Sequence, residues 1–234
     1  MTRLAASRRT QLTPDEIVAE ALRQFDAGPA EPTIRSLAAS LGVAPAAIYH
    51  HFSSQAAIFQ KACELVWNEA SVETLSVEPH PFHADPVDVL VAVGLGTRRA
   101  WMRHHRLSRY LTGSPEATEF TRNALGLLAS VFERMGMAPA EVGAAFHAYA
   151  TFMIGAVLFA AGNRTVNEQV FANRKTARTA FHAEPTPRAG SHSSAATRAA
   201  VDQMIDLSIV DPQRDEELYV FGLRRLVESL ARGS

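Results

Sequence analysis

The stretch from Thr33 to Phe52, TIRSLAASLGVAPAAIYHHF, decides the fold, because it encodes two short helices joined by a tight turn. Thr33 is a good N-cap for the first helix, and Gly42 supplies the permissive backbone that ends it. Pro45 suits the opening of the second helix, since its missing N–H is no loss there. The stretch therefore predicts a helix-turn-helix.

The second helix, at about residues 44–51, has two different faces at roughly 100° per residue. The side expected to pack consists of Ala44, Ile48 and Phe52. The side expected to face outward consists of Ala46, Tyr49 and His50. An exposed aromatic residue beside histidines favours a recognition helix for the DNA major groove. Spacing alone also fits a helical hairpin inside a larger bundle, and both interpretations stay open at this point.

Further helices are expected on both sides of this stretch. Residues 13–16, Thr-Pro-Asp-Glu, combine an N-cap, a proline at the first helical position and a glutamate where a capping box needs it. A helix therefore begins there, with Ile17, Ala21 and Phe25 on its packing face, and ends before Gly28. Another helix is expected after two capping serines at residues 53 and 54.

Residues 13–70 resemble the DNA-binding region of the tetracycline-repressor (TetR) family. The resemblance rests on LTPDEIVAEAL, on TIRSLAASLGVAPAAIYHHF and on the helix that begins near Ser53, and Ala-Ile-Tyr-His-His-Phe is its most specific part. It covers the first quarter of the chain strongly. The remainder is similar to the family's effector-binding and dimerisation region in helical plan, length and closing helix. The resemblance implies a dimeric regulator, a repressor that a small hydrophobic or aromatic effector releases from a pseudo-palindromic operator.

Nine residues are expected to contact DNA: Thr33, Arg35, Ala44, Pro45, Ala46, Tyr49, His50, His51 and Gln55. No Arg, Lys, Asn or Gln lies between Val43 and His51, so the second helix is expected to read thymine methyl groups. Arg35 lies where relatives can reach a base. Gln55 lies where the family commonly has a lysine, so one phosphate contact loses its charge.

The chain is expected to have two regions, residues 1–70 with a basic arm and the DNA-binding helices, and residues 71–234 for effector binding and dimerisation. Prolines in residues 78–85 mark the boundary, and residues 184–199 are expected to be a flexible loop. No β-alternation, phosphate loop or nucleophile elbow occurs in the sequence. The predicted fold is therefore all-α.

Two apolar stretches, residues 146–161 and 212–230, resemble the helices that form the family's four-helix dimer interface. Gly155, Ala156 and Gly222 would allow close approach there. The residues that offer apolar walls and polar groups for an effector are Trp101, Met102, His105, Phe132, His147, Tyr149, Phe152 and Met153. Taken singly, each of them is better explained as ordinary core packing, so the expectation concerns the region and not any one residue.

Composition limits the remaining classes of protein. A formal charge of −1 and a pI near 6.8 argue against an architectural DNA protein that binds without sequence preference. A single cysteine excludes an internal disulfide framework, and the arginine-rich N-terminus has no apolar segment typical of a secretory signal. The apolar run at residues 146–161 is too short to span a membrane. We therefore expect a cytoplasmic protein without a membrane association.

The alternative function is a helical enzyme with an accessory DNA-binding hairpin. Such an enzyme needs a nucleophile, an acid–base pair or a metal, and no such set is evident. His80 and His83 lie near two carboxylates, but prolines keep that segment extended and no cysteine supports a site. The sequence predicts no metal, no cofactor and no catalytic residue.

Overall fold

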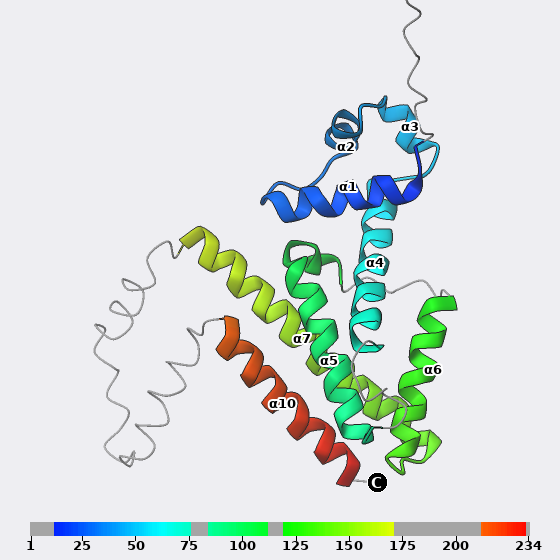
Figure 1. Ribbon diagram of the computed structural model, residues 1–234, viewed down its shortest axis with the longest axis vertical. Helices are drawn as coiled ribbons and strands as arrows, with labels where there is room; N and C mark the ends of the chain where they lie inside the picture. Colours follow the sequence, from blue (N-terminus) through cyan, green and yellow to red (C-terminus); the bar gives the residue numbers. More distant parts are fainter. Residues whose placement is uncertain (1–11, 76–83, 112–118, 171–211, 233–234) are drawn as a thin grey trace, which may run out of the picture. The chain divides into compact units, whose positions relative to one another are not determined.

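The computed structural model describes residues 12–75, 84–111, 119–170 and 212–232, which form helices and turns without a strand (Figure 1). The all-α prediction is confirmed. The helices in chain order are α1 Pro14–Ala27, α2 Ile34–Leu41, α3 Pro45–Tyr49, α4 Gln55–Leu75, α5 Pro86–Arg103, the 3₁₀ helix η2 His105–Tyr110, α6 Glu119–Arg134, α7 Pro139–Val170 and α10 Pro212–Arg232.

The described residues pack into two compact units. The first comes from Met1–His83 and Gly96–Leu127, and the second from Ala84–Leu95 and Leu128–Ser234. Both α5 and α6 therefore contribute to each unit. This division by packing differs from the functional division expected at residues 70 and 71, which stays a prediction.

The first unit is built on α1, which packs against α2 and α4. The N–H of Thr13 donates to the Glu16 carboxylate at 2.8 Å, and the N–H of Glu16 donates to Thr13 Oγ1 at 3.3 Å, so the predicted capping box is present. Ile17, Ala21 and Phe25 are all buried, as their spacing predicts. The apolar side of α1 is thus the core of this unit.

In the second unit, α7 packs against α10, and both hold the first half of α5. The hydroxyl of Tyr149 donates to the carbonyl of Leu90 at 2.8 Å, and that of Tyr219 donates to the carbonyl of Gly94 at 2.9 Å. A Cβ at Gly94 would overlap Leu223 and lie 3.0 Å from the Tyr219 hydroxyl. Glycine is therefore required where α10 meets α5.

The length of α7 corrects one prediction. The helix runs to Val170, whereas the sequence reading ended its apolar part at Ala161 and judged it too short for a membrane span. Residues 139–164 are in fact long and apolar enough to cross a membrane, with mean hydropathy 1.7 and 22% of the apolar stretch buried. The predicted basic arm, the segment with His80 and His83, and the predicted loop at residues 184–199 lie outside the described residues.

Candidate nucleic-acid interface

Thr33, Gly42 and Pro45 each do what their residue types predict in the helix-turn-helix. The N–H of Ser36 donates to Thr33 Oγ1 at 3.1 Å, and the N–H of Thr33 donates to Ser36 Oγ at 2.9 Å, which caps α2. Gly42 ends α2 with a left-handed backbone at φ 67°, a conformation that favours glycine. Pro45 is the first residue of α3.

The helix α3 is shorter than predicted and packs through fewer residues. It ends at Tyr49, and Ile48 is completely buried beneath it, while Phe52 is half-buried. Ala44 is exposed, so the prediction that it packs is wrong. Its backbone is extended, with φ −73° and ψ 146°, and helical periodicity does not apply to a residue outside the helix.

The outward face of the hairpin carries most of the residues expected to contact DNA. Tyr49 is 57% exposed. Arg35 on α2 is exposed and forms no hydrogen bond or ion pair with the described residues. The other exposed members of the set are Thr33, Ala44, Pro45, Ala46, His50 and His51. These side chains are available to a DNA duplex.

Gln55 differs from the rest of the set, because a partner holds its side chain. It opens α4, which Ser54 caps by accepting the N–H of Ala57 at 3.2 Å. The Gln55 amide donates to Oε1 of Glu31 at 2.9 Å. Sequence reasoning missed Glu31, which lies in the connection between α1 and α2.

Polar contacts between α1 and α2 hold the helix-turn-helix against α1. Arg23 binds Glu20 at 2.6 Å within α1 and also donates to Ser40 Oγ on α2 at 3.2 Å. The hydroxyl of Ser36 donates to the Gln24 side chain at 2.7 Å. The hydrogen bond from Arg23 lowers the pKa of Glu20 to about 2, against the opposing effect of burial. Glu20 is therefore ionised at neutral pH.

The residues predicted to bind an effector fall into both units. Trp101, Met102 and His105 belong to the first, where the ring of Trp101 packs edge-on against Trp67 with centroids 5.6 Å apart. In the second unit the ring of Phe132 contacts Tyr149, and that of Phe152 stacks on Tyr219. Met153 is buried there, but His147 is exposed and does not join the buried members.

A metal site has no support in the described residues. They contain no group of three or more His, Cys, Asp or Glu side chains that could hold an ion.

Comparison with known proteins identifies the hairpin. A sequence profile described as "Bacterial regulatory proteins, tetR family" matches residues 17–62, which include α2 and α3. The structure of the transcriptional regulator SCO7222, a TetR from Streptomyces coelicolor, is similar with 26% identity and a TM-score of 0.69, over 94% of this chain and 98% of that one. The chain is a TetR-family transcriptional regulator. As a member of the TetR family it is not an enzyme, so the alternative of a helical enzyme is not supported.

Two more distant structures share the fold. A TetR variant of Acinetobacter baumannii AYE in complex with minocycline is 20% identical, with a TM-score of 0.62 over 94% of this chain and 97% of that one. The Streptomyces coelicolor TetR family protein ActR in complex with (S)-DNPA is 16% identical, with a TM-score of 0.69 over 96% and 100%. No curated protein matches the chain by sequence.

Proposed function

We propose that this TetR-family regulator is a dimeric repressor that reads a pseudo-palindromic operator through α3 and leaves it when a small hydrophobic or aromatic effector binds. The observation that carries the proposal is α3 itself. Ile48 is completely buried, and the next residue, Tyr49, is the most exposed aromatic side chain of the hairpin. A short helix that is buried on one side and exposed on the other suits insertion into a DNA major groove.

The exposed residue types define how this face would read DNA. Ala46 and Tyr49 offer apolar contacts to thymine methyl groups, since α3 has no long polar side chain for a bidentate base contact. Arg35 has no competing partner among the described residues and can form a bidentate contact with guanine. Thr33, His51 and the backbone amides that open α4 would contact phosphates.

Exposed apolar side chains on α7 and α10 support a two-fold dimer. Phe159 on α7 and Phe221 on α10 are 67% and 62% exposed. An added Cβ at Gly155 of α7 would meet nothing within 4 Å, which leaves room for a second chain. At Gly222 it would lie 3.0 Å from the Phe152 ring. Gly222 therefore also lets α10 pack closely on α7 within one chain.

A dimer interface would also explain the membrane-like composition of α7. Two helices of one chain that expose apolar side chains can cover each other in a second copy, because a two-fold axis makes the patch self-complementary. The segment is accordingly assigned to a dimer interface of a soluble cytoplasmic protein.

Effector binding is supported by relatives and by one buried donor. The structural relatives from Acinetobacter baumannii and Streptomyces coelicolor hold minocycline and (S)-DNPA. Here Trp101 is completely buried, and its Nε1–H has no acceptor among the described residues. A buried donor without an acceptor costs about 1–3 kcal/mol. The proposed effector is therefore apolar with an oxygen that accepts this hydrogen.

Selection of bound fragments from genomic DNA by the purified full-length protein tests the proposal. We expect one pseudo-palindromic motif with half-site centres roughly 34–36 Å apart. Tyr49→Ala should lose enrichment of that motif, whereas Val72→Ala, which shortens an exposed apolar residue on α4, should retain it. Enrichment of single half-sites by a monomer, or a protein soluble only in detergent, would contradict the dimeric assignment.

A further inference from the structure

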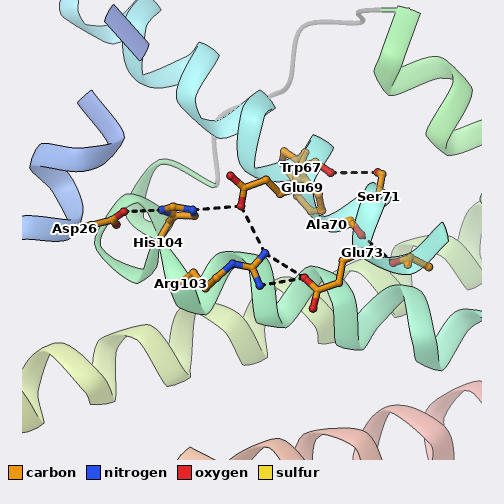
Figure 2. Close-up of polar contacts among 9 residues, drawn as sticks. Asp26, Trp67, Glu69, Ala70, Ser71, Glu73, Arg103 and His104 are labelled. Carbon is orange, nitrogen blue, oxygen red and sulfur yellow. Dashed lines mark hydrogen bonds and ion pairs between the residues drawn. The ribbon is translucent and has the colours of Figure 1, made fainter. Parts of the chain in front are cut away.

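The 3₁₀ helix η2 and its N-cap His104, together the segment 104–110, contact the end of α1. Figure 2 shows His104 beside Asp26, with 2.9 Å between Nδ1 and Oδ2. Arg106 donates to the backbone carbonyl of Asp26 at 3.0 Å. The last turn of α1 has no basic residue of its own, so Arg106 supplies the cation that the carbonyl end of a helix favours.

A second set of contacts lies at the far end of η2. The guanidinium of Arg109 lies over the rings of Phe25 and Tyr110, 5.7 and 5.4 Å from their centroids. It also lies 3.7 Å from the Glu31 carboxylate. The ring of Tyr110 packs against Phe25 and Phe59, so η2 covers the aromatic core beneath the helix-turn-helix. Burial and a hydrogen bond with Glu31 raise the pKa of Tyr110 to about 12, which keeps its hydroxyl protonated.

The two residues that the 104–110 segment contacts, Asp26 and Glu31, lie at the end of α1 and within the connection from α1 to α2. Asp26 lies in the last turn of α1, and Glu31 lies two residues before the N-cap of α2. Pro29 and Pro32 restrict the backbone between α1 and α2. A displacement of η2 that moved both acidic residues would therefore move α2 and α3 with them. Through Glu31 the same displacement reaches Gln55 at the start of α4.

The other end of the 104–110 segment is tied to α4 and continues α5. Figure 2 shows the His104 ring between Asp26 and Glu69, with Nε2 3.3 Å from Glu69. Arg103 at the end of α5 donates to Glu73 at 3.0 and 3.1 Å. In sequence, α5 directly precedes this segment, and its first ten residues, 86–95, which include Leu90 and Gly94, belong to the second unit.

We propose that η2 positions the reading hairpin, with Arg106 bound to the end of α1 at Asp26 and Arg109 to the α1–α2 connection at Glu31. The inference rests on the proposed function and deepens it, because it assigns the coupling between α5 and α3 to named positioning residues. It requires reciprocity: if η2 influences how α3 meets DNA, DNA on α3 must alter η2 by the same coupling free energy.

Trp101 provides a probe of η2 that needs no effector. It lies in the last turn of α5, four residues before η2 begins, and Trp67 is the one other tryptophan in the chain. The protein is labelled with 5-fluorotryptophan, and the Trp101 ¹⁹F resonance is assigned with Trp67→Phe. The ligand is the duplex that the wild-type protein selects most strongly from random-sequence DNA. We expect saturating duplex to shift the Trp101 resonance.

Three charge-neutralising variants locate the coupling. Arg106→Gln and Arg109→Gln should still bind the duplex, within about fivefold of wild type, because single exposed hydrogen bonds and ion pairs contribute about 1 kcal/mol or less. Both should lose the DNA-induced shift. Lys61→Gln removes a cation of the same unit whose partner among the described residues is Glu64 on its own helix, and it should keep the shift. Thermal unfolding of each variant establishes that the fold is retained.

The outcomes distinguish failure of the role of η2 from failure of the proposed DNA-binding function. A wild-type protein that binds the duplex without a shift at Trp101 would overturn the role of η2 and leave the proposed function standing. Retention of the full shift in Arg106→Gln and Arg109→Gln would overturn it too. If either variant fails to fold, Glu31→Gln removes the Arg109 contact from the other partner and must lose the shift. Absence of any selected duplex would overturn the proposed function itself.

Discussion

The side-chain amide of Gln55 donates a 2.9 Å hydrogen bond to the carboxylate of Glu31, which lies 24 positions earlier in the chain. Gln55 opens α4, where the free amides of a helix N-terminus attract a phosphate. A carboxylate beside those amides opposes that attraction, because it carries the same charge as the phosphate. DNA affinity at this position is thus set by the pair and not by Gln55 alone.

Gln55→Lys should tighten operator binding and steepen its salt dependence by less than one unit of log–log slope per half-site. The new ammonium group would remain partly neutralised by Glu31. The double variant Gln55→Lys, Glu31→Gln should recover the full increase of about 0.9 per half-site. Fluorescence anisotropy over a series of KCl concentrations measures both slopes. Gln60→Lys, which adds the same charge farther along α4, is the control, and equal slopes for the single and double variants would contradict the role of Glu31.

Arg35→Ala should relax base preference at one guanine in each half-site. A bidentate contact with guanine contributes roughly 1–3 kcal/mol of discrimination. Competition between the selected duplex and duplexes with single substitutions measures the change. Arg35→Lys keeps the charge without the bidentate geometry and should also lose discrimination. Uniform weakening on every duplex would instead assign Arg35 to phosphate binding.

Phe221→Glu should dissociate the dimer. Burial of an aromatic anchor at the centre of an interface is worth about 2 kcal/mol or more, so the dimer dissociation constant should rise by at least roughly 30-fold. Sedimentation equilibrium measures it. Leu125→Glu places the same charge on an exposed apolar residue of α6, and this variant should dimerise like the wild type. A fully dimeric Phe221 variant would place the interface elsewhere.

Glu20→Gln should lower stability at neutral pH and become harmless in acid. The folded-state pKa of Glu20, about 2, lies below its ordinary value of 4.5, so ionised Glu20 stabilises the fold above pH 4.5. That contribution is lost as the pH falls from 4.5 towards 2. Its size should not exceed about 1 kcal/mol, because the Arg23 side chain is 62% exposed. Urea unfolding across this range measures it, and Arg23→Gln should remove most of the difference.

The sequence predicted the hairpin well where a requirement is local. Thr33, Gly42 and Pro45 are cap, left-handed residue and helix opener for backbone reasons that act within a few positions. The sequence did not predict features that depend on where a helix begins in the folded chain or on contacts between distant residues. Helical periodicity predicted that Ala44 packs, but the helix begins one residue later, at Pro45. Glu31, the partner of Gln55, is brought next to it by tertiary packing.

The contact between Arg106 and the carbonyl of Asp26 joins residues 80 positions apart. The piece of this protein that could be exchanged with a relative is therefore discontinuous. A hybrid built by cutting at residue 70 would present the carbonyl end of α1 to whatever side chains the other parent has after its own α5. Grafting residues 104–110 together with residues 1–70 keeps Arg106 and Asp26 from one parent. Such a hybrid could combine the DNA specificity of one protein with the effector response of another without breaking this hydrogen bond.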